Sequence, residues 1–243
     1  MRPVGDQEVG AAEAALARSD RMAVSAEFRW FWRGQPPEGL EDWFLEAKAH
    51  PCAAGGGKTR KDHYLKAVGE ADLGIKYRGD PTLAPEDRSV EVKGLIAVSD
   101  SALASAPFVG PIQIWCKWPS GALHLPVASL IVLQKQRWLR KFNTDRASPE
   151  EIRLNTDEKP FDGSEPPKRG CNVELTKVDF VAAGETWWTM GFEAFGSLQT
   201  IEGDLRSVAA TFARRLSGDR LQSIRGELMS YPAWLVERTK SLG

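Results

Sequence analysis

Basic side chains stand at alternate positions in several short segments of this chain, often beside an acidic residue. In the segment SAEFRWFW (25–32), Glu27 and Arg29 alternate with Phe28, Trp30 and Trp32. Because side chains of a β-strand alternate between its two faces, this segment would be a strand with one charged and one aromatic face. Five later segments repeat the pattern, with charged positions at Lys76 and Arg78, Glu91 and Lys93, Lys117, Lys135 and Arg137, and Glu193.

The charged faces have two candidate environments, bulk water or the inside of a closed sheet. Long charged side chains usually stay in water, so a solvated outer face is the simpler interpretation of any single strand. About eight antiparallel strands, however, tend to close into a barrel. If the amphipathic helices of this chain cover the tryptophan-rich faces, the charged faces point into the barrel.

Charges inside a barrel need partners, because removing an ion from water costs several kcal/mol. The predicted cations are Arg29, Lys76, Arg78, Lys93, Lys117, Lys135 and Arg137, and they outnumber the carboxylates Glu27, Glu91 and Glu193. The excess predicts an anionic guest. A polyphosphate suits such a site because arginine binds phosphate through two parallel hydrogen bonds. The carboxylates would then hold a divalent cation, which prefers carboxylate and phosphate oxygens.

Period-two patterns place the strands, and apolar residues every three or four positions place the helices. The predicted strands are 22–33, 62–68, 73–79, 89–98, 111–118, 127–142, 171–181 and 185–195. Leu40, Trp43 and Phe44 predict a helix within 36–50. Two closing helices are predicted from the stripes Ile201, Leu205, Val208, Phe212, Leu216 and Leu221, Ile224, Leu228.

The simplest organisation is an N-terminal arm (1–20) followed by one domain (21–243) that ends in helices over about 197–243. The polar stretch 143–170 predicts an insertion loop, with a short helix capped by Ser148 and Glu151. This loop and residues 36–60 are the segments in which substrate identity would be encoded.

The charge balance and the cysteines exclude several classes of protein. Lys and Arg number 32 against 33 Asp and Glu, so no global field attracts nucleic acid or anionic lipid, and any basic site must be local. Three scattered cysteines fit a reduced protein better than a disulfide framework. No apolar run approaches about 18 residues, and no signal-peptide core is present. These features predict a cytoplasmic protein without a membrane partner.

In their order and spacing, these segments resemble the CYTH or triphosphate tunnel superfamily, which includes inorganic, thiamine and RNA triphosphatases and class IV adenylate cyclases. That family begins with an ExExK strand, and the register that keeps its final base is Ser25-x-Glu27-x-Arg29. The other similar motifs are RKDHYL (60–65), LGIKYRG, VEVKG, the basic VLQKQR, the closing WTMGFEAFG, and SYPAWL (230–235), which is similar to the ending of the family's last helix. The likeness spans about residues 22–236.

The resemblance implies an α+β protein, mainly antiparallel β, built on an eight-stranded closed tunnel-like barrel with helices packed outside. It implies a metal-dependent phosphohydrolase that acts on inorganic tripolyphosphate or a nucleoside triphosphate. Glu27 and Glu193 would be the catalytic residues and would hold Mg²⁺ or Mn²⁺. The phosphates would be held by Arg29, Lys76, Arg78, Lys93, Lys135 and Arg137.

Two departures from the family pattern leave alternatives open. Ser25 and Phe195 stand where the family has acidic residues, and Glu91 or Glu174 could substitute as metal ligands. A weakened metal site would slow hydrolysis and leave phosphate binding intact. The chain would then be a sensor of a nucleotide, a polyphosphate or an RNA 5′ end. A third hypothesis is an adenylate cyclase-like activity, in which ATP is cyclised.

Overall fold

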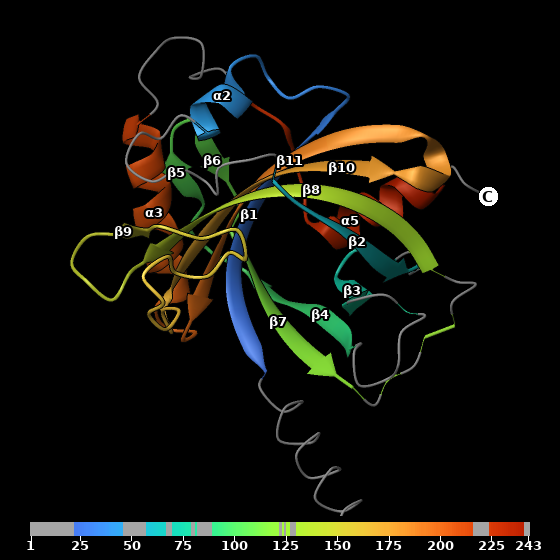
Figure 1. Cartoon of the computed structure of the whole chain (residues 1–243), viewed down its shortest axis with the longest axis horizontal. Coiled ribbons are helices and arrows are strands. Elements are labelled where there is room, and N and C mark those ends of the chain that lie inside the picture. Colours follow the sequence, from blue (N-terminus) through green and yellow to red (C-terminus); the bar gives the residue numbers. More distant parts are fainter. Residues whose placement is uncertain are drawn as a thin grey trace, which may run out of the picture.

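The architecture is a ring of long β-strands with helices on its outside (Figure 1). The computed structural model describes residues 22–45, 57–66, 70–78, 81, 89–121, 123, 125–126, 130–215 and 224–240. The long strands are β1 (Ala23–Arg33), β2 (Lys58–Leu65), β3 (Leu73–Arg78), β4 (Ser89–Val98), β7 (Gln113–Ser120), β8 (Leu130–Asn143), β10 (Gly170–Phe180) and β11 (Glu185–Gly196). The shorter elements are β5 (Leu103–Ser105), β6 (Phe108–Gly110), β9 (Glu150–Ile152), β12 (Glu227–Leu228), a 3₁₀ turn (Val181–Ala183), and the helices α2 (Leu40–Leu45), α3 (Ile201–Arg215) and α5 (Tyr231–Thr239).

The long strands close into an eight-stranded antiparallel barrel. Their order is β10, β11, β1, β7, β4, β3, β2, β8, and β8 pairs again with β10 along its length. The predicted fold class is therefore confirmed. Within the described residues, every long strand has two hydrogen-bonded neighbours, so none of them stands at the edge of an open sheet.

The aromatic faces of the strands point outward and form a core under the helices. Phe28 and Trp30 of β1 are buried in this outer core together with Phe108 of β6. Phe192 of β11 packs edge-on against Phe212 of α3, with ring centroids 5.7 Å apart. The apolar stripe of α3 lies on this wall because its members recur every three or four residues. The opposite, charged faces of the same strands therefore point into the lumen of the barrel.

One end of the lumen is filled by apolar side chains and by helix α5. Phe31 shares the inward face of β1 with Glu27 and Arg29, yet it is buried in a second apolar cluster. Trp234 of α5 stacks on Phe31 with ring centroids 5.3 Å apart and is fully buried. Other members of this cluster are Leu133, Val178, Phe180 and Trp187. Helix α5 thus plugs this end, and the charged residues occupy the rest of the lumen.

Several predicted elements differ from the structure. The helix predicted at Ser148 is wrong: residues 150–152 form β9, which extends the ladder of β8. In the second closing stripe, residues 227–228 form β12 beside β1, and the last helix begins only after Ser230, whose hydroxyl caps it. Leu228 lies in this strand and Ile224 precedes it outside any helix, so the two do not share a helix face, and Leu221 lies outside the described residues.

The remaining differences concern boundaries. Strand β2 begins at residue 58 rather than 62, and α2 covers residues 40–45 of the predicted 36–50. The N-terminal arm (1–20) and the end of the predicted helix (46–50) lie outside the described residues.

Candidate functional site

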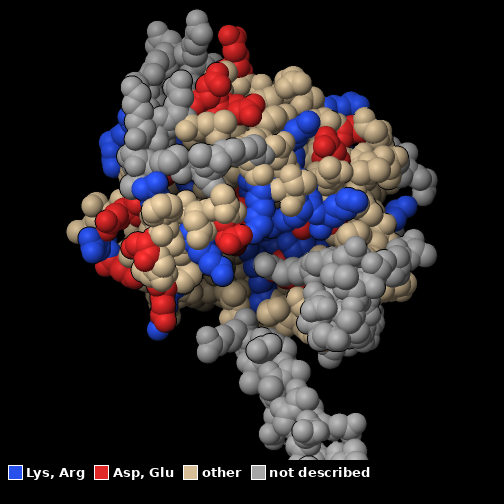
Figure 2. All heavy atoms as spheres, viewed as in Figure 1, with Lys and Arg blue, Asp and Glu red and all other residues tan. Residues whose placement is uncertain are grey.

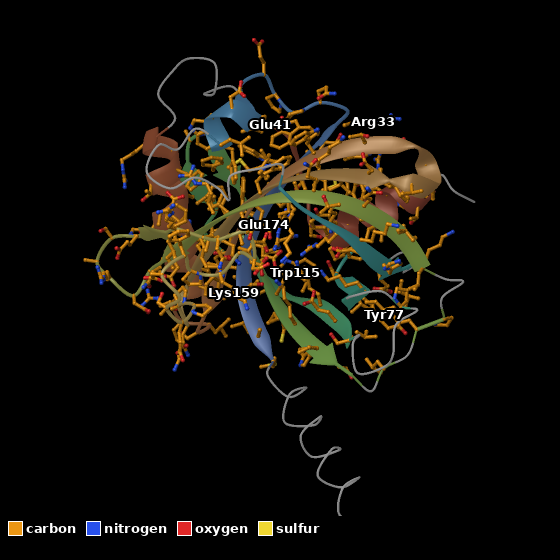
Figure 3. The ribbon with its side chains drawn as sticks, viewed as in Figure 1. Arg33, Glu41, Tyr77, Trp115, Lys159 and Glu174 are labelled. Atoms are coloured by element: carbon orange, nitrogen blue, oxygen red, sulfur yellow. The ribbon has the colours of Figure 1, made fainter. Side chains whose placement is uncertain are left out.

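The charged part of the lumen is a polar cavity of about 330 Å³. Figure 2 shows Lys and Arg side chains gathered in a hollow at the centre of one face, with acidic atoms among them. Basic residues that line the cavity are Arg29, Arg60, Lys76, Lys93, Lys117, Lys135, Arg137 and Lys141, and acidic ones are Glu27, Glu91, Asp157, Glu158, Glu174 and Glu193. In Figure 3, Glu174 lies within the outline of the barrel, whereas Arg33 and Glu41 lie at its periphery.

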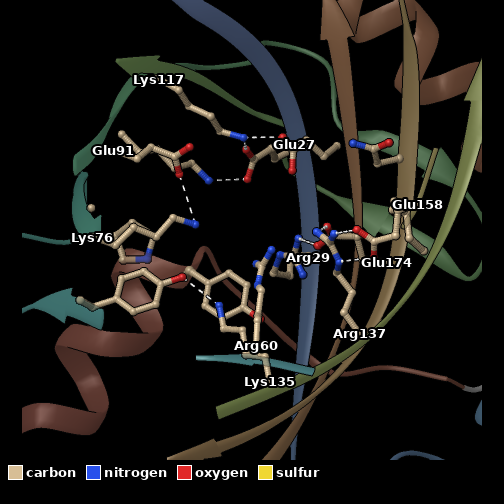
Figure 4. A pocket seen from close by; sticks show the side chains of 18 of the residues that line it. Glu27, Arg29, Arg60, Lys76, Glu91, Lys117, Lys135, Arg137, Glu158 and Glu174 are labelled. Atoms are coloured by element: carbon tan, nitrogen blue, oxygen red, sulfur yellow. Dashed lines mark hydrogen bonds and ion pairs between the residues drawn. The ribbon is translucent and has the colours of Figure 1, made fainter. Parts of the chain in front are cut away.

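A first group of charges surrounds Glu27 at the wall formed by β1, β4, β7 and β11 (Figure 4). Lys93 Nζ lies 2.5 Å from Glu27 Oε2, and Lys117 Nζ lies 3.1 Å from Glu27 Oε1. Lys117 also pairs with Glu193, the residue directly opposite Glu27 on β11. One ammonium group therefore bridges the two carboxylates that the sequence predicts as metal ligands.

The ion pairs of this first group shift the pKa values of Glu27 and Lys117. Burial opposes ionisation of Glu27, but Lys93 and Lys117 outweigh it and hold the pKa of Glu27 well below its usual range. Burial also opposes the charge on Lys117, but Glu193 and Glu27 raise its pKa above the usual value. Ser25, which stands where the resembled family has an acid, donates a hydrogen bond to Glu27 Oε1 at 2.9 Å. Glu27 and Lys117 are therefore held in their charged forms, whereas burial lowers the pKa of Lys93.

A second group is centred on Glu174 of β10, which joins two arginines. Arg29 Nη2 lies 3.0 Å from Glu174 Oε2, and Arg137 Nη1 lies 3.0 Å from Glu174 Oε1. Burial opposes ionisation of Glu174, but Arg137 and Arg29 lower its pKa below the usual range. The Arg29 guanidinium packs directly over Gly191, where a Cβ atom would come within 2.6 Å of Arg29 Cζ. It also lies 4.9 Å from the ring centroid of Tyr231.

A third group lies where the charged part of the lumen meets the apolar plug. Lys135 is 2 % exposed, and its Nζ lies 2.8 Å from both Asp62 Oδ2 and the Tyr64 hydroxyl. Burial lowers the pKa of Lys135 to about 7, with Arg60 and Lys76 adding repulsion against the attraction of Asp62. A buried lysine with such a shifted pKa, facing a polar cavity, is typical of functional sites.

The structure brings together nearly all the residues that the sequence predicts for the site. Glu27, Glu193, Glu91 and Glu174 line the cavity with Arg29, Lys76, Lys93, Lys117, Lys135 and Arg137. The side chain of Arg78, at the end of β3, lies outside the described residues.

Sequence reasoning missed Arg60, Asp62, Lys141, Glu158 and Tyr231. Arg60 and Asp62 share the inward face of β2 with Tyr64. A strand that begins at residue 58 places Arg60 on this face, and Asp62 is already the first residue of the predicted strand, where its acidic side chain points to the same face. Lys141 continues the inward face of β8 after Lys135 and Arg137. Glu158 and Tyr231 come from a turn and a helix, where no strand pattern points to the lumen.

The excess of positive charge is smaller than the sequence predicts. Besides Glu27, Glu91 and Glu193, the acids Asp62, Glu158 and Glu174 also pair with the cations of the lumen. The reason is physical: buried ions are tolerated only with partners nearby, and this protein supplies most of them itself. Among the described residues, Lys141 is a lining cation without an ion pair.

The carboxylates that the sequence predicts as metal ligands are paired with cations of the protein. Lys117 Nζ occupies the position between Glu27 and Glu193, and Glu174 is held by two guanidinium groups. Glu91 pairs with Lys76 at 3.2 Å. In the part of the chain that the structure describes, no group of three or more His, Cys, Asp or Glu side chains is arranged for a metal. Mg²⁺ or Mn²⁺ would have to displace an ammonium group to reach these oxygens.

Comparisons with known proteins do not assign this chain to a family. No family model matches it, and no curated protein matches its sequence. Within the described residues, no helix has the length and apolar composition needed to cross a bilayer.

Proposed function

We propose that the barrel binds a triphosphate-bearing anion, either inorganic tripolyphosphate or a nucleoside triphosphate, in its charged cavity. The observation that supports this proposal is the convergence of lysines and arginines from β1, β2, β3, β4, β7 and β8 on one cavity. The volume of about 330 Å³ lies in the range of small-molecule sites. The resemblance to triphosphate tunnel proteins favours the same ligand class and remains a prediction.

The internal carboxylates prepare the cations for such a ligand. Ion pairs to Glu27, Glu174 and Asp62 hold the ammonium and guanidinium groups in fixed positions, so little side-chain entropy is lost when a ligand binds. A triphosphate presents several negative charges within one chain of atoms, whereas each carboxylate presents one. The ligand can therefore compete for several cations at once.

Metal-dependent hydrolysis of the same ligand is the second candidate. It is favoured by the position of Glu27 directly opposite Glu193 on adjacent strands, both facing the cavity. Binding without turnover ranks first because Lys117 already joins these two carboxylates. Binding of an RNA 5′ end and cyclisation of ATP are narrower proposals within the same ligand class. The cytoplasmic location likewise stays a prediction.

A thermal-shift titration tests the proposal. Tripolyphosphate or ATP in EDTA should raise the melting temperature, increasingly with ligand concentration, because only the folded barrel offers the cavity. Arg60→Gln should weaken this shift, whereas Arg206→Gln, the same change on the outer helix α3, should leave it unchanged. No shift at millimolar ligand and low salt would refute the proposal. Phosphate release that requires Mn²⁺ or Mg²⁺ and disappears in Glu193→Gln would instead establish the second candidate.

A further inference from the structure

Two acidic residues that line the cavity, Asp157 and Glu158, come from outside the barrel wall. Glu158 lies in a tight turn of the insertion between β8 and β10. Asn155 Oδ1 accepts hydrogen bonds from the backbone N–H groups of Asp157 at 2.9 Å and Lys159 at 3.1 Å. The N–H of Glu158 donates to the carbonyl of Asn155 at 3.0 Å. Glu158 has φ 63°, a left-handed conformation that non-glycine residues seldom adopt. The turn therefore holds this side chain in one defined direction.

Both carboxylate oxygens of Glu158 accept hydrogen bonds from Arg137 (Figure 4). Arg137 Nε donates to Oε1 at 3.0 Å, and Arg137 Nη2 donates to Oε2. The remaining nitrogen, Nη1, donates to Glu174. All three nitrogens of this guanidinium thus have acidic partners. The two-oxygen contact is also the geometry in which arginine binds phosphate.

Glu158 differs from the other acids that pair with Arg137 and its neighbours. Glu174 and Glu27 belong to strands whose backbones are fixed by pairing on both sides. Residues 157 and 159, which flank Glu158, are exposed, and its side chain is about 15 % exposed. The side chain of Glu158 can therefore be displaced from Arg137 without any change in the pairing of the wall strands.

We propose that Glu158 is an intrinsic competitor for the anion site, so that a ligand must displace it to reach Arg137. The inference rests on the proposed function and deepens it by naming the residue that limits which anions bind. A ligand with several phosphoryl groups can displace Glu158, because its contacts with the other cations offset the lost ion pair. A monovalent anion has no such compensation.

Calorimetric titration with tripolyphosphate, at fixed ionic strength and in EDTA, tests the inference on Glu158→Gln. The amide keeps the size of the side chain but has only one acceptor oxygen and no charge. The two-oxygen ion pair with Arg137 is therefore lost. Tripolyphosphate should bind this variant about tenfold more tightly than the wild type or better, the effect of removing a competing charge-assisted contact. Thermal melting checks that the variant is folded.

The matched control is Asp157→Asn, the same loss of charge at the neighbouring residue, which also lines the cavity. Its affinity should rise by less than about threefold, as expected for a change at an exposed charge. Equal gains in the two variants would show an effect of net charge alone and would overturn the inference. Binding that Glu158→Gln leaves unchanged would also overturn it, while the proposed function stood. An absence of binding in all three proteins would refute the proposed function and the inference with it.

Discussion

The two ends of the lumen are built from the same strands and filled in opposite ways. On the inward face of β8, Leu133 belongs to the apolar plug, and Lys135, two residues further on, begins the charged cavity. On β1, Phe31 and Arg29 mark the same boundary. At the plugged end Trp234 of α5 is fully buried, whereas at the other end ion pairs line a cavity of about 330 Å³. A barrel interior can therefore be stabilised by packing at one end and by mutual neutralisation at the other, and only the second end can exchange its partners for a ligand.

Acidification should lower the free energy of unfolding more than any single substitution does, because it protonates several carboxylates of the charged end together. Burial opposes ionisation of Glu27, Glu174 and Asp62, but their Lys and Arg partners outweigh it and lower the three pKa values below the usual value of about 4. The unfolded chain therefore takes up protons at a higher pH than the folded protein. The resulting stability is present above pH of about 5 and is lost as the pH falls through about 4 and below.

Urea unfolding between pH 7 and about pH 3 measures this loss. Trp234→Ala, a change at the plugged end, should lower the free energy of unfolding at every pH by a similar amount and leave the slope unchanged. A profile that stays flat below pH of about 4 would contradict the ion-pair account of the charged end.

Trp234→Ala should give the largest effect of a single substitution. The side chain is fully buried between strands, so its removal should lower the free energy of unfolding by about 3–5 kcal/mol. Trp118→Ala is the control, because Trp118 lies on the outer face of β7 and is 43 % exposed. It should cost less than about 1 kcal/mol. Similar losses in the two variants would show that α5 is not the plug of the lumen.

Glu174→Gln should cost roughly 3 kcal/mol, because it leaves the buried Arg29 and the partly buried Arg137 without their shared partner. Glu150→Gln, which breaks the exposed pair with Arg146, should cost less than about 1 kcal/mol. Tripolyphosphate should stabilise any variant that keeps the cavity, but the gain should be larger in the Glu174 variant, where two arginines lack their shared partner, than in Trp234→Ala. Equal gains in both variants, measured by thermal melting, would contradict the distinction between the two ends.

Gly191→Ala should have the smallest effect of the three substitutions, about 1–3 kcal/mol. The added methyl would collide with the Arg29 guanidinium and push it away from Glu174. Gly203→Ala in α3 is the control: nothing lies near the added methyl, and alanine favours the helix. Chemical denaturation compares the pair, and a neutral Gly191→Ala would mean that Arg29 can reposition at no cost.

The barrel and most of its wall residues could be predicted because strand alternation is a local property of the sequence. The period-two alternation predicts that Glu27, Arg29, Lys93 and Lys135 lie on the charged faces of their strands, and closure of the barrel turns those faces inward. The same alternation places Glu174 on the inward face of its strand, with Thr176 and Val178. Glu174 reduces the excess of positive charge in the lumen, and this effect can also be predicted from strand alternation.

Other features depend on the path of the chain in space. Nothing local shows that the turn at Glu158 bends toward Arg137, or that Tyr231 meets Lys135 from a helix far along the sequence. The division of one inward face into apolar and charged ends also depends on where α5 docks. Pairing preferences within strands contain no information about that docking.

The pairing of β1 with β12, a strand about 200 residues further along the sequence, has a consequence for how the chain folds. The first half of β1 pairs with β7, but at Trp30 and Phe31 its neighbour is β12. Trp32 Nε1 donates to the carbonyl of Arg225, 193 positions away along the chain. Contacts between such distant residues slow folding, because a very long loop must close before they form. During synthesis the first strand must therefore wait for residues 224–240 to be made, and until then its aromatic side chains would depend on other surfaces for protection from aggregation.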